Sequence, residues 1–358
     1  MKTIHLNASK SYDILIDNGL FNQVFSLIEP FCKDRSVAII TDDIVDKLYG
    51  EQLLKQLKQN EYSVVKYVFL NGEASKNINT LSNILEFLAD NNFKRNDYII
   101  ALGGGVVGDI AGLASAIYMR GISFIQIPTT LLAMVDASVG GKTAIDLQAG
   151  KNLAGVFWQP SLVICDVDII KKLPDDIFKE GMGEVLKYDV IENLGIFEKV
   201  LNDKVFDDLD SIIYECIKSK QKIVEEDEFE TKGTRKLLNV GHTFAHGLEK
   251  LSNYEIFHGV AVATGLVWEA GISYKLGMCS KEAFNEIKQV VVKWNLLIDF
   301  NYDFKELVEA MKKDKKNDDI LISFVLPLEI GKCVEHKIDT SILINVLNDI
   351  CNEKIIVF

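Results

Sequence analysis

The feature that most constrains the fold is a change of pattern near the middle of the chain. In the first half, apolar runs of strand length alternate with longer segments whose apolar residues recur three and four positions apart. The strand-like runs are 36–41, 63–70, 97–102, 124–128 and 162–165, and helical segments include 44–58 and 77–90. Such alternation predicts a mostly parallel sheet with helices on both faces.

The second half has a different pattern. After about residue 174 the strand-like runs nearly disappear, and only 320–326 is predicted to be extended. Helices are predicted at 175–193, 207–227, 243–251 and 280–294. We therefore predict two domains, an α/β Rossmann-like domain with a parallel sheet over 1–173 and an all-α domain over 174–358.

Charge and composition exclude several classes of protein. The 358 residues carry 39 Lys and Arg against 52 Asp and Glu, a net charge of -13, which argues against nucleic-acid binding. No apolar run reaches the ~18 residues of a membrane span. The six cysteines form no CxxC pair, which is typical of reduced thiols in a cytoplasm. These features predict a cytoplasmic protein with no nucleic-acid or membrane partner.

A glycine loop directly follows the strand-like run 97–102. Gly103, Gly105 and Gly108 satisfy the GxGxxG pattern, in which glycines let the backbone approach a pyrophosphate at the start of a helix. The loop does not follow the first strand, and no acidic residue stands ~20 positions later at the end of a next strand. The residues alone therefore leave open dinucleotide binding and a simple tight turn.

Cationic side chains accompany two further glycine segments, 140–142 and 150–152. Arg120 precedes them, Lys142 ends the first, and Lys151 lies within the second. Backbone N–H groups beside mobile positive charges are what a phosphate or carboxylate site needs. A solvated loop is the alternative, although a cationic cluster in an acidic protein favours an anionic ligand.

Histidines are concentrated in one region. Of five in the chain, His242, His246 and His258 lie within seventeen residues. The HxxxH pair lacks the central glutamate of HExxH, so a zinc protease is not expected. Arg235 and Asn239 precede the pair at spacings that would place all four on one helix face.

A carboxylate and a lysine share a second predicted helix face, with Glu180, Glu184 and Lys187 at i, i+4 and i+7. Two imidazoles and one carboxylate, with a fourth position open, describe a catalytic zinc-type site. A hydrogen-bonded histidine pair is the alternative that the residues leave open.

Taken together, the motifs resemble the 3-dehydroquinate synthase family of sugar-phosphate cyclases. They occur in the family's order over almost the whole chain. They are GGGVVGD at 103–109, PTTLLAMVDASVGGKTAID at 128–146, GKN at 150–152, GMGEVLKY at 181–188, LLNVGHTFAHGLE at 237–249 and HG at 258–259.

The resemblance implies a fold, cofactors and site residues. It implies an NAD-binding N-terminal domain, a helical C-terminal domain that binds Zn²⁺ or Co²⁺, and a homodimer. The implied metal ligands are Glu184, His242 and His258, with His246 as an acid/base or hydrogen-bonding residue. The residues implied to contact NAD are Asp42, Gly72, Glu73, Lys76, Gly104, Gly105, Val106, Asp109, Thr129, Thr130, Lys142 and Lys151.

The implied substrate is 3-deoxy-D-arabino-heptulosonate 7-phosphate, which the family converts to 3-dehydroquinate and phosphate in the shikimate pathway. The implied steps are transient oxidation by NAD, phosphate elimination, reduction and intramolecular aldol closure, with no net redox change. The residues implied for the pocket are Arg120, Asp136, Lys142, Asn152, Lys187, Lys220, Arg235 and Asn239, with Lys315 or Lys316 as one further lysine.

The chain departs from the family pattern at a few positions. Val260 stands where the family has a glutamate after His-Gly, which predicts the loss of a carboxylate that supports a metal ligand. Asp189 replaces a usual glycine, and Ile44 replaces a polar residue that contacts NAD. Gly233-Thr234-Arg235 replaces the usual Gly-Leu-Arg, and the stretch before it is one residue longer. None of these changes removes a predicted ligand.

Three other functions compete with this one. A 2-deoxy-scyllo-inosose synthase would act on glucose 6-phosphate, but the retained GGKTAID, Lys220 and His246 argue against it. A glycerol-dehydrogenase-like enzyme would form NADH and would not need the cations Arg120, Lys142, Lys151 and Arg235. A non-catalytic binding module is not expected, because the predicted metal ligands are intact.

Overall fold

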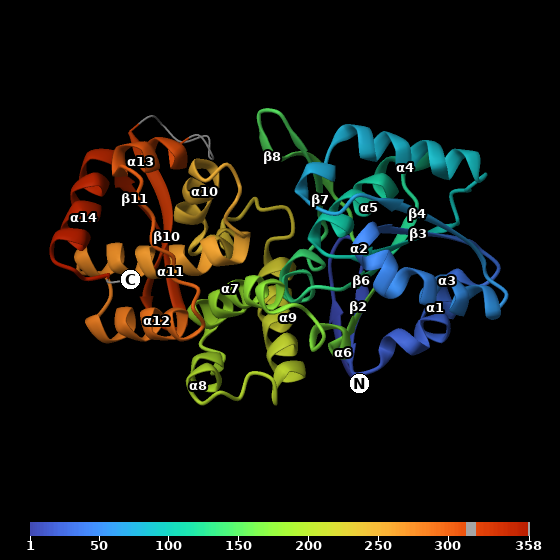
Figure 1. Cartoon of the computed structure of the whole chain (residues 1–358), viewed down its shortest axis with the longest axis horizontal. Coiled ribbons are helices and arrows are strands. Elements are labelled where there is room, and N and C mark those ends of the chain that lie inside the picture. Colours follow the sequence, from blue (N-terminus) through green and yellow to red (C-terminus); the bar gives the residue numbers. More distant parts are fainter. Residues whose placement is uncertain (313–319, 357–358) are drawn as a thin grey trace. The chain divides into compact units, whose positions relative to one another are not determined.

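The computed structural model describes residues 1–312 and 320–356, which divide into two compact units (Figure 1). The first unit consists of Met1–Leu173 and Lys220–Phe229, and the second of Pro174–Ser219 and Glu230–Phe358. The return of 220–229 to the first unit was not predicted. It begins inside the helix α9 (Leu209–Glu226), whose apolar periodicity gives no sign that its packing partners change.

A seven-stranded sheet forms the centre of the first unit. Its order is β1-β2-β9-β6-β5-β3-β4, and every neighbouring pair is parallel except β1 with β2. All five predicted strand runs are present. The strands are β1 (Lys2–Leu6), β2 (Tyr12–Asp17), β3 (Ser36–Asp42), β4 (Ser63–Phe69), β5 (Tyr98–Gly103), β6 (Ser123–Pro128) and β9 (Leu162–Asp166).

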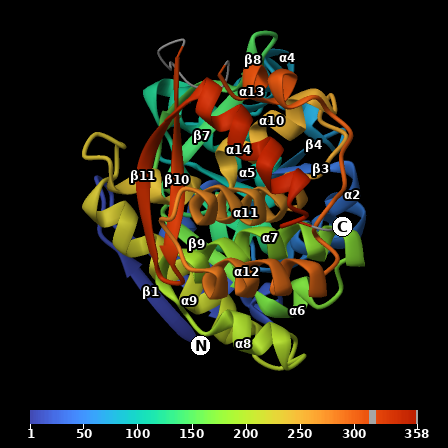
Figure 2. The ribbon, with the colours of Figure 1, turned by 90° about the vertical axis from the view of Figure 1, so that its left-hand side faces the viewer.

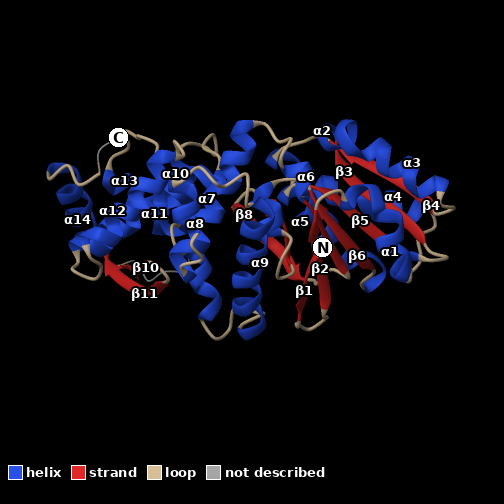
Figure 3. Cartoon of the chain, turned by 90° about the horizontal axis from the view of Figure 1, so that it is seen from below, coloured by secondary structure: helices blue, strands red, loops and turns tan. Residues whose placement is uncertain are grey.

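Helices cover both faces of this sheet, as the alternating pattern predicts (Figures 1 and 3). On one face, Ile84 of α4 (Ile78–Asp90) and Ile110 of α5 (Gly105–Ile117) share a buried core with Ile40 and Ile99 of the sheet. The other face is covered by α1 (Val24–Cys32) and α3 (Glu51–Gln59). Short helices α2 (Asp43–Val45) and α6 (Val167–Ile170) follow β3 and β9.

The two cationic glycine segments, 140–142 and 150–152, lead into the two strands of a β-hairpin. Strands β7 (Lys142–Leu147) and β8 (Gly150–Phe157) pair in antiparallel register, and β7 packs along α5. The sequence gives little sign of β8, because its side chains are half-buried or exposed throughout and do not alternate between polar and apolar.

The second unit is built around a buried helix, α11 (His258–Lys275), as Figure 2 shows. Val262 and Trp268 are at most 1% exposed, and Phe244 stacks on Trp268 with ring centroids 5.1 Å apart. A helix buried on all sides shows little amphipathic pattern. The other helices are α7 (Asp175–Glu192), α8 (Ile196–Leu201), α10 (His242–Leu251), α12 (Lys281–Lys293), α13 (Phe304–Lys312) and α14 (Thr340–Asn352), with part of α9.

The second unit is not entirely helical, which corrects the all-α prediction in detail. β10 (Leu321–Glu329), which contains most of the predicted extended run, pairs with a second strand, β11 (Lys332–Asp339). That strand was missed because five of its eight residues are exposed and four are charged, so it is not an apolar run. No helix among the described residues is long and apolar enough to cross a membrane.

Asp189, one of the departures from the family pattern, caps a helix. It is 1% exposed and accepts the N–H groups of Ile196 at 3.1 Å and Phe197 at 2.7 Å, at the start of α8. We expect Asp189→Ala to lower the free energy of unfolding by about 1–2 kcal/mol, because those N–H groups lose their acceptor. Urea unfolding measures the effect, and an unchanged midpoint would contradict it.

Candidate functional site

Predicted nucleotide-binding segments meet at the carboxyl edge of the parallel sheet. Asp42 ends β3, Gly104 follows β5, and the N–H of Thr129, after β6, donates to Gly103 O at 3.0 Å. The chain passes from β3 outward to β4 and then returns to β5 on the other side of β3. In open α/β sheets, ligands bind at the carboxyl edge where the strand order reverses in this way.

The glycines of this loop permit close packing between helix and strand. An ideal Cβ on Gly103 would lie 2.4 Å from the Val107 side chain, and one on Gly108 would lie 2.8 Å from Gln126 Oε1. Gly104 is the N-cap of α5 and has no side chain to cap it. Gly104, Gly105 and Val106 remain partly exposed, so the first N–H groups of the helix can face an anion.

Two of the other predicted residues at this edge cap helices. Asp42 is 4% exposed, and its Oδ1 accepts the N–H groups of Ile44 and Val45 at 2.9 Å each. Thr130 Oγ1 accepts the N–H of Ala133 at 3.2 Å. The contacts of these two residues with NAD stay predictions.

A buried ion pair joins three predicted segments beside this loop. Lys76 is 4% exposed, and its Nζ lies 2.6 Å from Asp109 Oδ2 and 2.5 Å from Asn152 Oδ1. Glu73 lies 3.9 Å from Lys76 and 3.7 Å from Lys151. Burial would lower the pKa of Lys76, but the Asp109 and Glu73 carboxylates outweigh it and raise the pKa. Lys76 therefore stays charged and ties the Gly72–Lys76 segment to α5 and the hairpin.

The predicted trio of cations is split. Lys151 lies with Lys76 near the start of α5, whereas Arg120 follows the end of that helix. Lys142 lies toward the same end as Arg120, because Trp158 packs on Gly121 and its backbone N–H donates to Gly141 O at 2.7 Å. This separation was not predicted, because the three cations are close in the sequence while the two ends of α5 lie a helix length apart.

Two predicted pocket residues are in direct contact within the first unit. Lys220 Nζ lies 2.9 Å from Asp136 Oδ1 and donates to Asp136 O at 2.8 Å. Lys220 belongs to the part of α9 that packs with the first unit, which explains how residues so distant in sequence meet.

In the second unit, α7 and α11 cross with their backbones in contact. An ideal Cβ on Gly183 would lie 1.9 Å from Gly259 O, and one on Gly259 would lie 1.7 Å from Glu180 O. Only glycine fits at either position. The next residue after Gly183 is Glu184, and the residue before Gly259 is His258. The glycine contact thus brings two predicted metal ligands together.

A second glycine contact positions the third ligand. An ideal Cβ on Gly265 of α11 would lie 2.0 Å from Gly241 O. Gly241 has a φ of 81°, a left-handed conformation that favours glycine, and it immediately precedes His242, the first residue of α10. All three predicted ligands therefore adjoin a glycine at a helix contact.

The three ligand side chains converge on one point. Glu184 Oε1 lies 3.3 Å from His242 Nε2 and 3.3 Å from His258 Nε2. The Glu184 side chain is 1% exposed, that of His242 12% and that of His258 30%. The three form a group whose ligand atoms could hold a metal ion, and His258 is the most exposed of them.

The hydrogen bonds of the two rings fit a cation at this point. Burial lowers the pKa of His242 to about 4, so the ring is neutral near pH 7. Its Nδ1–H donates to Val240 O at 3.1 Å, which leaves a lone pair on Nε2 facing the Glu184 carboxylate. Two acceptors facing each other at 3.3 Å are unfavourable unless a cation lies between them.

His258 is held on both sides. Its Nδ1 lies 3.3 Å from Glu249 Oε2, opposite the Nε2 that faces Glu184. Burial would lower the pKa of His258, but hydrogen bonds to Glu184 and Glu249 outweigh it and raise the pKa to about 10. A divalent ion bound by Nε2 would replace the proton of the imidazolium and leave Nδ1–H bonded to Glu249.

Glu249 was not predicted, and it corrects the interpretation of Val260. The missing glutamate after His258-Gly259 does not leave His258 without a carboxylate, because Glu249 supplies one from α10. Glu249 is 3% exposed. The signal that could have found it is its place on the same helix as His242 and His246, at i+7 and i+3.

Two other predicted residues of the second unit, Lys187 and His246, lie near this centre. Lys187 is 1% exposed and its Nζ lies 2.5 Å from Glu184 Oε2. The ring of His246 lies 5.7 Å from that of His242 and 6.2 Å from that of His258. His246, Glu249 and His258 form a second group of potential ligand atoms.

The predicted single helix through Arg235, Asn239, His242 and His246 is wrong. Arg235 and Asn239 belong to a 3-10 helix, Thr234–Asn239, and α10 begins only at His242. Gly241, in a left-handed conformation, separates the two helices. Arg235 is nonetheless 2% exposed, an unusual burial for a guanidinium.

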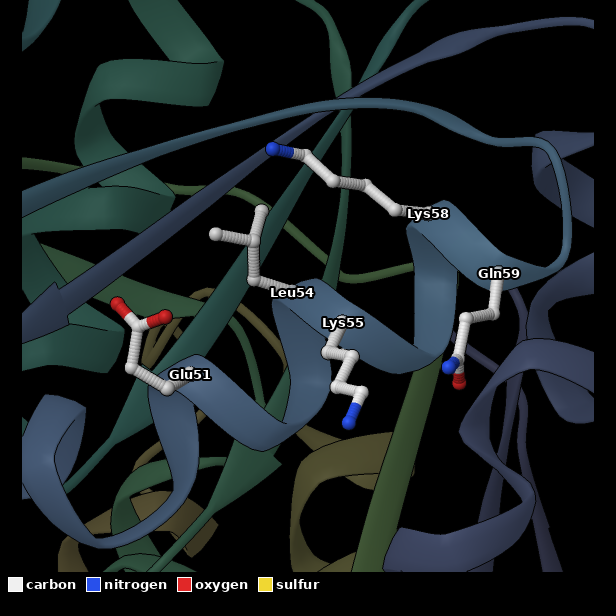
Figure 4. Close-up of a pocket in the computed structure, with 5 residues that line it drawn as sticks. All are labelled: Glu51, Leu54, Lys55, Lys58 and Gln59. Carbon is white, nitrogen blue, oxygen red and sulfur yellow. The ribbon is translucent and has the colours of Figure 1, made fainter.

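Two further observations concern what is not assigned to the site. The predicted Lys315 and Lys316 lie outside the described residues. A surface hollow lined by Glu51, Leu54, Lys55, Lys58 and Gln59 lies along α3 (Figure 4). It contains none of the predicted site residues, so we assign it no part in the site.

Solved structures share this fold over almost the whole chain. A 2-deoxy-scyllo-inosose synthase, in complex with carbaglucose-6-phosphate, NAD⁺ and Co²⁺, is 24% identical with a TM-score of 0.88, covering 97% of this chain and 100% of its own. A 2-epi-5-epi-valiolone synthase from Streptomyces hygroscopicus subsp. jinggangensis 5008, with NAD⁺ and Zn²⁺ bound, is 22% identical with a TM-score of 0.88, covering 98% and 99%.

Sequence comparison identifies the family. Residues 66–180 match the model of the 3-dehydroquinate synthase N-terminal domain, and residues 181–317 match that of its C-terminal domain. The 3-dehydroquinate synthase of Clostridium acetobutylicum is 40% identical over 347 residues, which cover 95% of this chain and 97% of that protein. The chain therefore belongs to the 3-dehydroquinate synthase family.

Proposed function

We propose that the chain converts 3-deoxy-D-arabino-heptulosonate 7-phosphate to 3-dehydroquinate and phosphate, as a step of the shikimate pathway. Identity of about 40% over nearly the full length of named 3-dehydroquinate synthases supports the assignment. The observation that carries it is the convergence of Glu184, His242 and His258, the three residues that the family resemblance marks as metal ligands.

We propose NAD and one Zn²⁺ or Co²⁺ ion as cofactors. NAD would accept a hydride and return it in the same turnover, and the metal would act as a Lewis acid on a substrate oxygen. Glu184, His242 and His258 would hold the ion, and the first turn of α5 would bind the NAD pyrophosphate. The nitrogen and oxygen ligands accept either metal, so availability decides between them.

The proposed substrate carries two anionic groups, a carboxylate and a phosphate, and the chain's cations suit it. Lys187 is buried on α7, and Arg235 is buried in the 3-10 helix Thr234–Asn239. At buried positions a positive charge interacts strongly with an anion. Arg120, Asp136, Lys142, Asn152, Lys220 and Asn239 stay predicted pocket residues. Binding one substrate through several steps needs positioning more than many separate acid/base groups. His246, near the ligand rings, is proposed to exchange protons with the substrate.

We further propose that the enzyme acts as a homodimer in the cytoplasm. The resemblance to the family supports both statements. Light scattering coupled to size-exclusion chromatography tests the first. A mass near 80 kDa, twice the 40.2 kDa of the chain, is expected, and a monomer at micromolar concentration would contradict it.

Phosphate release tests the function. Chelator-treated protein is mixed with 3-deoxy-D-arabino-heptulosonate 7-phosphate, with and without added Zn²⁺ and NAD, while absorbance at the NADH wavelength is followed. We expect metal-dependent release of phosphate with no lasting NADH signal, because the hydride returns to the product. Steady NADH formation with a polyol, or phosphate release only from glucose 6-phosphate, would move the chain to a related activity.

A further inference from the structure

Glu269 is a buried carboxylate that none of the predicted roles uses. It lies on α11 and is 0% exposed. Both of its oxygens accept backbone N–H groups at the start of α10: Oε2 from Gly241 at 2.6 Å and Oε1 from Phe244 at 3.1 Å. Burying a carboxylate is costly unless it is fully hydrogen-bonded, so its place here calls for a function.

The N-terminus of α10 has no cap of its own. Its N-cap residue is Gly241, which has no side chain and makes no side-chain cap hydrogen bond. The first N–H groups of a helix need acceptors, and a negative charge there also interacts favourably with the helix dipole. Glu269, on the neighbouring helix α11, supplies both the acceptors and the negative charge.

The residue between these two hydrogen bonds is a proposed metal ligand. The N–H groups of Gly241 and Phe244 flank His242, whose Nδ1–H is bonded to Val240 O at 3.1 Å. The backbone around His242 is thus fixed by Glu269, and the ring is fixed by the backbone. We infer that Glu269 is a positioning residue of the metal centre: it holds His242 so that Nε2 meets Glu184 and His258.

This inference rests on the proposed function, since it assumes that the centre binds a metal. A residue that only stabilised the helix would lower the free energy of unfolding and leave the geometry of the bound metal unchanged. Residues that support metal ligands typically change metal affinity about 10–100-fold when they are replaced. Metal affinity and the metal's spectrum therefore separate the two roles.

The matched control is another carboxylate cap in the same unit. Asp339 caps α14 by accepting the N–H of Ser341 at 2.8 Å, and its helix contributes none of the predicted metal ligands. Asp339→Ala removes a cap of the same chemistry away from the centre. Glu269→Ala removes both acceptors, and Glu269→Gln keeps one while turning an amide N–H₂ toward a backbone N–H.

The experiment measures Co²⁺ binding to the full chain by competition with a chelator, together with the visible spectrum of bound Co²⁺ and urea unfolding. We expect Glu269→Ala to weaken Co²⁺ binding about 10–100-fold and to shift the spectrum, and Glu269→Gln to do so less. Asp339→Ala should lower the free energy of unfolding and change neither the Co²⁺ affinity nor the spectrum of bound Co²⁺.

Two results would contradict these proposals, each in a different way. If Glu269→Gln binds Co²⁺ with the unsubstituted affinity and spectrum, the inference is wrong, and this variant decides the question even if Glu269→Ala does not fold. If the unsubstituted chain binds no Co²⁺, the proposed metal centre itself fails, which is a different outcome from a failure of the role of Glu269.

Discussion

Replacing His258 with alanine is expected to remove the tightly bound metal and to lower the rate of phosphate release about a hundredfold or more. The ring supplies one of three ligand atoms, and two remaining ligands hold a divalent ion only weakly. The fold should survive, because the buried ion pair of Glu184 and Lys187 stays intact. Metal content after dialysis, measured by mass spectrometry, and phosphate release are the two readouts.

Two other histidines serve as comparisons. His246→Ala should keep its metal while losing activity, because His246 lies outside the group of Glu184, His242 and His258. His5→Ala should change neither, since His5 is exposed, its ring Nδ1 lies 2.7 Å from Asp13 Oδ1, and it belongs to the first unit. If His258→Ala keeps one metal ion per chain and full activity, the ligand assignment is wrong.

The sequence predicted the layers of the first unit and the ligand group of the second. Strands such as β3 and β5 are buried on both faces and therefore appear as continuous apolar runs. Glu184 and Lys187 share a face of α7, as their spacing indicates. Such features depend on short stretches of chain, where periodicity is informative.

What the sequence could not predict depends on contacts between distant segments. The β7–β8 hairpin was hidden because β8 is not clearly amphipathic. Glu249 and Glu269 were missed because each acts on a residue from another helix, and a single carboxylate has no distinctive pattern. The break before α10 follows from the left-handed Gly241, and a spacing argument assumes an unbroken helix.

The glycines of the metal-binding helices show why local patterns are insufficient. Gly183, Gly241, Gly259 and Gly265 look like weak positions in helices, since glycine disfavours a helix interior by about 1 kcal/mol relative to alanine. The structure shows that each lies where two backbones touch. Three of them, Gly183, Gly241 and Gly259, are next to a ligand in the sequence, so helix spacing and ligand geometry are determined together.

Gly259→Ala should therefore disrupt the metal centre without touching a ligand. Its Cβ would lie 1.7 Å from Glu180 O, a backbone atom, so α7 and α11 must move apart. We expect a loss of about 4 kcal/mol or more in the free energy of unfolding. In whatever protein remains folded, we expect a drop of about tenfold or more in Co²⁺ affinity, because Glu184 and His258 separate. Urea unfolding and chelator competition measure the two effects.

The matched control lies further along the same helix. Gly271 also belongs to α11, but a Cβ there would meet only side-chain atoms, the nearest at 3.4 Å, which is ordinary contact. Gly271→Ala should keep the metal and raise stability by up to about 1 kcal/mol, because alanine favours the helix. Should Gly259→Ala behave like Gly271→Ala, the backbone contact would not set the ligand geometry. A loss confined to Gly259→Ala would show that helix spacing sets it.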